Sequence, residues 1–153
     1  MTIVGSLNAE RFTGAALNVG VSDLALQITK EHVNQRTLFG KKPIGAYQGV
    51  QHPLAQNKAN TDAARLMLYY GVKLYDQGID AGAYANSAKL IGSQAANRMC
   101  DDAIQFHGGS GMDEDTGMLA LWRMSRTSRI APVNNEMVLS YIAEHVIGLP
   151  RSI

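Results

Sequence analysis

The chain has 153 residues, of which 46% are hydrophobic and 18% are charged, and its formal net charge is +1 at pH 7. This length and composition are typical of a folded chain with one packed core and argue against disorder. A charge so close to zero gives no overall field that would attract nucleic acid or an anionic membrane surface, so we expect neither as a partner.

The first third of the chain has the periodicity of a long helix. Apolar residues recur every fourth position from Phe12 to Ile28, which predicts a helix with Asn8 as its N-terminal cap that continues to about Arg36. A glycine and a proline follow closely and are expected to end this helix. Residues 41–51 should then form a connection.

Two further long helices are expected next. The second has Pro53 in its first turn and ends at Gly78, and the third begins near Asp80. The third has an apolar stripe, expected in the core, and an opposite polar face. The stripe consists of Tyr84, Ala88, Ile91, Ala95 and Met99, and the polar face consists of Asn86, Lys89, Ser93, Asn97 and Asp101.

Two shorter helices are predicted at the end of the chain. One should cover residues 117–128, and after an interrupting proline either Asn134 or Asn135 can cap a last helix that ends at Gly148. No segment keeps the alternation of an amphipathic strand for long. The sequence therefore predicts an all-α fold, an antiparallel bundle of four-helix type, with residues 1–153 in a single domain.

The cysteine and histidine residues favour neither a disulfide nor a metal site. Cys100 is the single cysteine and lies in a helical run, so we expect a buried structural thiol in a reducing compartment. The four histidines lack metal-ligand spacing. The N-terminus does not have the pattern of a signal peptide and no apolar run approaches the roughly 20 residues that cross a bilayer, so secretion and membrane insertion are not expected.

One motif links the end of the first helix to the connection that follows it. Arg36-x-x-Phe39-Gly40, leading to Gln48, resembles the segment of the acyl-CoA dehydrogenase family that contacts the pyrophosphate and adenine of FAD across a dimer interface. The resemblance implies FAD contacts for Arg36, Phe39 and Gln48, with Tyr47 beside them. This chain has one extra residue before Gln48. Taken without the resemblance, an arginine at a helix C-terminus beside a core phenylalanine is the commoner explanation.

A glycine turn after the third helix and a polar pair near the chain end extend the resemblance. The run Q-F-H-G-G at residues 105–109 is similar to the family's Q-x-x-G-G element and implies FAD contacts for Gln105, Gly108 and Gly109. Asn134 and Glu136 fall at the family's T-x-[QE] contacts to FAD. Helix capping and complementarity to the helix dipole are the structural alternatives for this pair.

The catalytic base can be assigned only by resemblance. Most family members have a glutamate late in the chain, at the position where this sequence has Pro132, which supplies neither a carboxylate nor a backbone N–H. The isovaleryl- and long-chain-type branch has its glutamate on the first helix, and there Glu10 matches the base and Arg11 matches an arginine of the acyl-CoA site. An acidic residue in a first helical turn is also explained by the helix dipole.

The resemblance covers about residues 7–147 and only the C-terminal domain of a complete dehydrogenase, so this chain alone is expected to be inactive. It implies a domain of an FAD-dependent enzyme of lipid metabolism that removes an α proton and a β hydride from an acyl-CoA thioester. A dimer or tetramer, an electron-transfer flavoprotein or companion dehydrogenase subunit as partner, and a bacterial cytoplasmic or mitochondrial matrix location are implied. A catalytically silent FAD-contacting assembly module, and an acyl-CoA oxidase or flavin monooxygenase domain, remain as alternatives.

Overall fold

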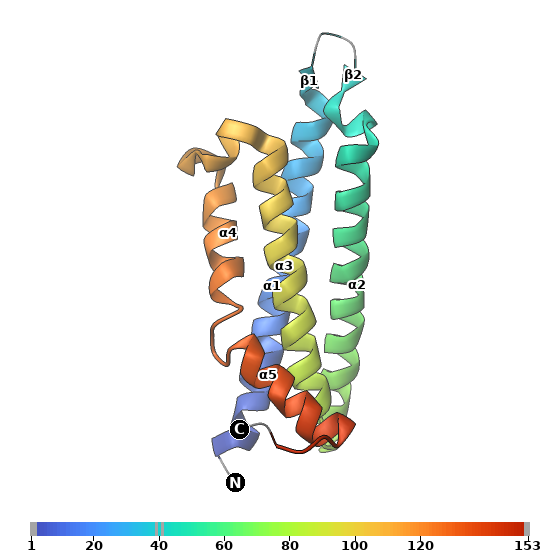
Figure 1. The fold of residues 1–153 in the computed structure, drawn as a ribbon, viewed down its shortest axis with the longest axis vertical. Coiled ribbons are helices and arrows are strands. Elements are labelled where there is room, and N and C mark those ends of the chain that lie inside the picture. The colour runs from blue at the N-terminus through green and yellow to red at the C-terminus, as the bar shows by residue number, and fades with distance from the viewer. Residues whose placement is uncertain (1–2, 39, 41, 152–153) are drawn as a thin grey trace.

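The computed structural model describes residues 3–38, 40 and 42–151, and it confirms the predicted all-α class (Figure 1). The five α-helices of the described residues are α1 (Ile3–Gln35), α2 (Gln48–Asp76), α3 (Gly82–His107), α4 (Met118–Thr127) and α5 (Asn135–Tyr141), and α5 continues as a π-helix over Ile142–Ile147. Two short strands, β1 (Thr37–Leu38) and β2 (Lys42–Pro43), pair in antiparallel fashion between α1 and α2. The described residues also form three 3₁₀ turns, at Ile44–Ala46, Gly108–Met112 and Glu114–Thr116.

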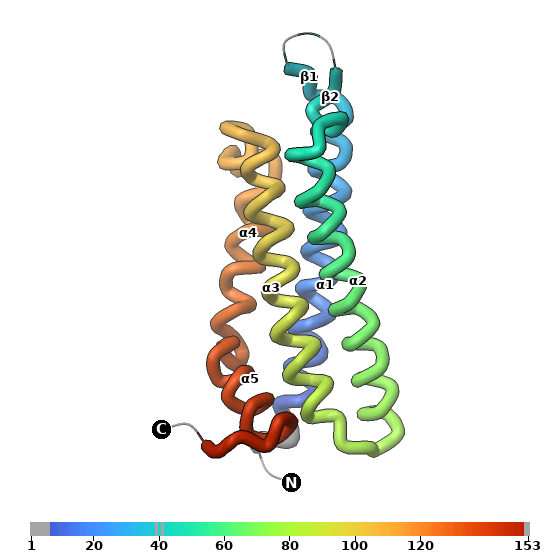
Figure 2. Tube along the Cα trace, turned by 45° about the vertical axis from the view of Figure 1, so that its right-hand side comes forward, coloured from blue at the N-terminus to red at the C-terminus, as the bar shows by residue number. Residues whose placement is uncertain are grey.

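The helices alternate in direction along the bundle (Figure 1). α1, α2 and α3 run its length, and α4 lies beside α3, as the second view also shows (Figure 2). The β1–β2 hairpin and the C-terminus of α3 lie toward one end, which we call the hairpin end. α5 lies against the opposite end, near the start of α1, and we call this the α5 end.

Two predicted helix starts were wrong. α1 begins at Ile3, so Asn8 lies inside the helix and does not cap it; its Oδ1 instead accepts a hydrogen bond from Nη1 of Arg11 at 3.0 Å. α2 begins at Gln48, so Pro53 lies beyond the first turn and α2 includes part of the predicted connection. The helix ends that were predicted from a following glycine agree with the structure. α2 stops just before Gly78, where φ is +72°.

The core is built largely from small side chains, which lets α1, α2 and α3 approach closely. At Gly71 on α2, a Cβ atom would lie 2.6 Å from Cε1 of Phe12 and 2.8 Å from Cβ of Tyr84, so only glycine fits between these neighbours. Cys100 is fully buried as predicted, and burial raises the pKa of its thiol to about 11. Two apolar clusters share this core, one formed by Val21, Ala25, Ala96, Met99, Cys100, Ala103 and Met118 and the other by Phe12, Ala15, Leu68, Ala81, Ala85 and Ala88.

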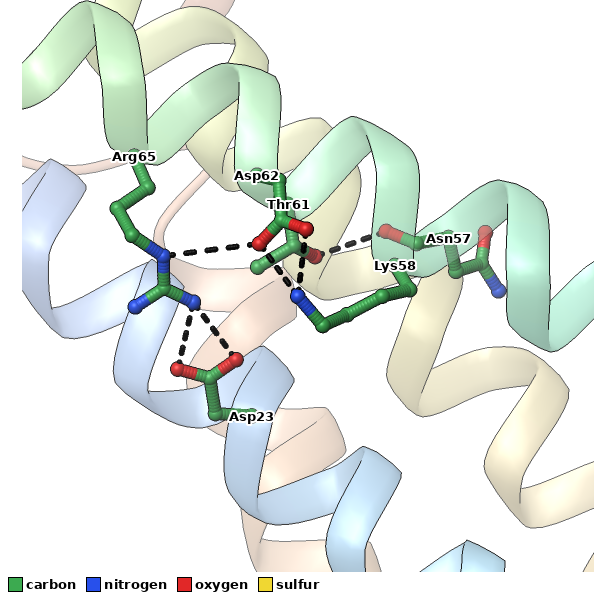
Figure 3. A network of polar contacts seen from close by, with 6 residues as sticks. All are labelled: Asp23, Asn57, Lys58, Thr61, Asp62 and Arg65. Atoms are coloured by element: carbon green, nitrogen blue, oxygen red, sulfur yellow. Dashed lines mark hydrogen bonds and ion pairs between the residues drawn. The ribbon is translucent and has the colours of Figure 1, made fainter.

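An ion-pair network joins α1 to α2 near the surface (Figure 3). Nη2 of Arg65 donates to both carboxylate oxygens of Asp23 at 2.8 Å, and its Nε lies 3.7 Å from Asp62. Lys58 pairs with Asp62 one turn away, and the hydrogen bond from Lys58 is the largest cause of a lowered pKa at Asp62. Pairs between side chains as exposed as these contribute little to stability. The Arg65–Asp23 pair links α2 to α1, whereas the pairs made by Asp62 lie within α2.

Candidate functional site

The polar face predicted for α3 is largely buried. Asn86 and Lys89 are each 1% exposed and Ser93 is 0% exposed, whereas Asn97 is half-buried and Asp101 is exposed. The first residue of α5 bonds to this face at Lys89 and Ser93, so what looks like a solvent-facing surface in the sequence is an interface between helices.

A buried cation is the centre of that interface. Nζ of Lys89 donates to Oδ1 of Asn135 at 2.7 Å, and Nδ2 of Asn135 donates to Oγ of Ser93 at 3.0 Å. Asn135 is 2% exposed. The ion pairs formed within the described ranges do not include Lys89. Burial, with smaller contributions from Arg11 and Arg129, lowers the pKa of Lys89 to about 8, and Glu136 opposes that shift.

Arg11 is a second buried cation at the α5 end. It is 6% exposed, and its Nε has no hydrogen-bond partner in the described part of the chain. Burial lowers the pKa of Arg11, while Tyr141 and Glu10 raise it. Two buried cations without a bonded carboxylate are costly to hold, since ionised groups normally enter an interior only when paired.

The turn between α4 and α5 rests against α1. A Cβ atom built on Gly14 would lie 3.9 Å from Cδ of Pro132. Glu10 is one helical turn before Gly14 on the same face of α1, and its side chain is exposed. The two positions at which the resemblance puts a catalytic glutamate, Glu10 and Pro132, are therefore neighbours in space.

Asn134 and Glu136 lie where this turn meets α5. Oδ1 of Asn134 accepts from the backbone N–H of Met137 at 2.8 Å, so the predicted capping role is confirmed. Glu136 is exposed in the first turn of α5, where a carboxylate complements the helix dipole.

The hairpin end holds the other predicted residues of the site. Arg36, Gln48 and Gln105 are exposed, Tyr47 is the N-cap of α2 and is 49% exposed, and Phe39 lies outside the described residues. Arg36 is fixed through its backbone, since its N–H bonds to His32 and its carbonyl accepts from Ile44, both at 2.8 Å.

The glycines that follow α3 leave the helix terminus open. Gly108 ends α3 with φ +61°, a conformation that residues with a side chain rarely adopt, and Gly109 follows it at the surface. A Cβ at either position would meet no described atom within 4 Å. His107 stacks on His32 with ring centroids 4.1 Å apart, which joins the ends of α3 and α1 and so positions this glycine turn beside Arg36.

A single chain does not bring Arg36 and Gln105 of the hairpin end close to Asn134 and Glu136 at the start of α5. Asn135 bonds to Lys89, which is 16 residues before Gln105 on α3, so these two positions are about 24 Å apart along the helix at 1.5 Å per residue. Arg36 and Gln105 are therefore far from Asn134 and Glu136 within a single bundle. The predicted convergence on one dinucleotide requires two chains.

A separate groove of about 800 Å³ lies between α2, α3 and α4, and it contains none of the predicted residues of the site. Arginine and aspartate side chains with Trp122 dominate its lining. Elsewhere, no described helix is long and apolar enough to span a bilayer, and no group of three His, Cys, Asp or Glu side chains in the described ranges could hold a metal ion.

Sequence reasoning missed Lys89, Ser93 and Asn135 as a buried polar cluster. The available signal was weak: the small residues Ala85, Gly92 and Ala96 lie on the same side of α3 as Lys89, and small residues permit a close approach of a neighbouring helix.

Comparisons with known proteins agree on one family. The family model described as "Acyl-CoA dehydrogenase, C-terminal domain" matches residues 2–147. Acyl-CoA dehydrogenase FadE12 of Mycobacterium tuberculosis is 41% identical over 152 residues, which are 98% of this chain and 39% of that protein.

Solved structures give the same result. Butyryl-CoA dehydrogenase from Megasphaera elsdenii matches with a TM-score of 0.90 and 28% identity, over 94% of this chain and 37% of that one. PigA, solved with FAD and proline, matches with a TM-score of 0.88 and 33% identity, again over 94% of this chain and 37% of the other. The chain thus spans less than two fifths of the length of these relatives.

Proposed function

We propose, from the premise that this chain belongs to the acyl-CoA dehydrogenase family and matches its C-terminal domain, that it serves an FAD-dependent enzyme that oxidises an acyl-CoA thioester to its α,β-unsaturated form. The α proton goes to a carboxylate of the protein and a hydride leaves the β carbon. Bound FAD supplies the acceptor for that hydride.

The hairpin end offers suitable chemistry for the phosphate and adenine part of FAD. Arg36 is exposed, and a guanidinium can donate two parallel hydrogen bonds to a phosphate. Gly108 and Gly109 leave the backbone open to a bulky group, and Gln105 offers an amide donor and acceptor beside them. These residues fit the cofactor.

Two copies of the chain complete each FAD site in this proposal. Asn134 and Glu136 flank the first residue of α5, and α5 lies toward the end of the bundle opposite the β1–β2 hairpin that follows Arg36 (Figure 2). A dimer in which the hairpin end of one copy meets the α5 end of the other brings both groups to one cofactor.

Glu10 is the proposed base, and the observation that supports this assignment is that Cδ of Pro132 lies 3.9 Å from the point where a Cβ of Gly14 would be, one helical turn from Glu10. A carboxylate at Glu10 can reach the same part of the substrate as the late glutamate of most relatives, because the position of that glutamate, Pro132, lies close to α1 near Glu10. Glu10 is exposed in this chain. Bound substrate and the rest of the enzyme would cover it, and desolvation raises the pKa of a carboxylate and so strengthens it as a base.

The complete FAD-bound protein carrying Glu10→Gln provides the test. We expect anaerobic bleaching of the flavin by butyryl-CoA and isovaleryl-CoA to slow by about 10²–10⁴-fold, the range typical of a lost general base, while FAD stays bound. Glu31→Gln is the matched control, since Glu31 is also exposed on α1. Bleaching at the wild-type rate in Glu10→Gln would eliminate Glu10 as the base.

Pro132 favours a second candidate, a catalytically silent module that contributes FAD contacts and assembly surface. A proline there has neither the carboxylate nor the N–H of most relatives. The complete wild-type protein discriminates the two: the silent module binds FAD and self-associates but shows no bleaching with either thioester.

A further inference from the structure

We propose that Lys89 is a positioning residue that, through Asn135, holds the turn between α4 and α5 against α1 and thereby fixes Pro132 beside Glu10. The turn comprises residues 128–134. The expected effect of Lys89 on the reaction rests on the proposed function, whereas its role in holding the turn does not.

The contacts form a continuous path from α3 to α1. Nζ of Lys89 donates to Oδ1 of Asn135 at 2.7 Å, and Asn135 also bonds to Ser93 on the same helix. The backbone N–H of Asn135 donates to the carbonyl of Arg129 at 3.1 Å and closes the turn at its base. Pro132, inside that closed turn, lies against α1 at Gly14.

Backbone hydrogen bonds tie residues 128–131 to the end of α4, and the second half of the turn has fewer described bonds. Pro132 and its two neighbours toward α4 are exposed. The side chain of Asn134 is committed to capping α5, and the guanidinium of Arg129 reaches Asn97 only at 3.4 Å. The buried bonds of Asn135 are therefore what ties the second half of the turn to α3.

An ammonium group suits this task better than an apolar side chain. A charged donor makes a hydrogen bond roughly twice as strong as a neutral donor does, and the bond fixes one rotamer of Asn135. Replacing a buried charge by an apolar group of similar volume is often neutral or stabilising for the fold. A lysine kept at 1% exposure without a bonded carboxylate is thus better explained by positioning than by stability.

Several charged groups face Lys89 from the elements around it. Arg11 on α1 and Arg129 in the turn lower its pKa, and Glu136 on α5 raises it. Among the described residues, Asn135 accepts the hydrogen bond of the ammonium group, and no carboxylate forms an ion pair with it.

Hydrogen exchange of the complete FAD-bound protein tests the positioning directly. In Lys89→Met we expect the amides of residues 128–137 to exchange at least about tenfold faster, with no fall in the melting temperature. Lys58→Met is the matched control, since Lys58 is a half-buried lysine on α2, away from the turn. Asn135→Asp keeps an oxygen acceptor opposite Lys89 and should retain wild-type exchange.

Flavin bleaching by isovaleryl-CoA is the second measurement. We expect Lys89→Met to slow bleaching at saturating substrate at least about tenfold, and Asn135→Asp and Lys58→Met to remain within twofold of wild type. Unchanged exchange over residues 128–137 in Lys89→Met overturns the inference, and so does raised exchange with an unchanged bleaching rate.

The two proposals fail in different ways. If wild-type protein shows no bleaching while Lys89→Met raises exchange in the turn, the proposed function falls and the role of Lys89 in holding the turn stands. If Lys89→Met does not fold, Ser93→Ala removes the Ser93 contacts of Asn135 without changing a charge. Faster exchange in that variant supports the inference, and wild-type exchange contradicts it.

Discussion

Substitution of Gly71 by alanine tests how closely the three long helices approach one another. A Cβ at this position would lie 2.6 Å and 2.9 Å from two ring atoms of Phe12 and 2.8 Å from Cβ of Tyr84. Carbon atoms in contact prefer about 3.5–4.0 Å, so helices or ring must move by about 1 Å. Phe12 is 5% exposed and packs edge-on against Tyr75, which leaves its ring little room to turn.

Two opposing effects set the magnitude. Overpacking a well-packed core costs about 1–3 kcal/mol. Replacing glycine by alanine inside a helix gains about 1 kcal/mol in helix propensity. We therefore expect Gly71→Ala to lower the free energy of unfolding by up to about 2 kcal/mol, which corresponds to a fall in melting temperature of up to roughly 8 °C for a chain of this size.

Urea unfolding followed by circular dichroism measures the effect. The matched control is Gly20→Ala on α1, where an added Cβ meets no described atom within 4 Å and should stabilise the protein by about 0.5–1 kcal/mol. If both variants stabilise the protein equally, the close approach of α1, α2 and α3 at Gly71 does not exist in solution.

The remaining predictions concern titration, capping and thiol reactivity. The pKa of Lys89 falls from 10.5 to about 8 on folding, so the unfolded chain binds more protons than the folded chain between these pH values. The free energy of unfolding should therefore rise with pH across that window, by up to about 3 kcal/mol. Lys89→Met should lose this rise when urea unfolding is compared at pH 7.5 and pH 10. Asn134→Ala removes the cap bond to Met137 and should cost about 1 kcal/mol, and no loss would mean that the bond is not made in solution. Cys100, with its pKa raised to about 11, should not react with a disulfide reagent at pH 8 until urea unfolds the chain, and fast reaction of the native protein would contradict its burial.

Local sequence patterns were sufficient to predict the helices and the helix ends that are followed by glycine. They failed at the start of α1, where Ile3 and Val4 are β-branched and Gly5 has poor helix propensity, so that this segment resembles a lead-in. Pro53 was expected in a first turn because its missing N–H costs nothing there, yet α2 begins five residues earlier. In both places the helix extends beyond what intrinsic propensity predicts.

The polar cluster at the α5 end could not be predicted in the same way. The period of α3 separates Lys89 and Ser93 from the apolar stripe, but only the folded chain brings Asn135 over them. The resemblance brought out Glu10 and Pro132 as separate positions, and their proximity emerged from the contact between Pro132 and α1. The proposed convergence of Arg36 with Asn134 on one cofactor depends on a second copy, and only the family resemblance suggested it.

The placement of the proposed cofactor contacts toward opposite ends of the bundle has a genetic consequence (Figure 1). In the proposed dimer, one subunit that lacks Arg36 and another that lacks Glu10 would together form one undamaged centre and one centre with both defects. Two alleles, each without activity alone, should therefore complement each other when they are co-expressed, whereas two alleles that affect the same end should not.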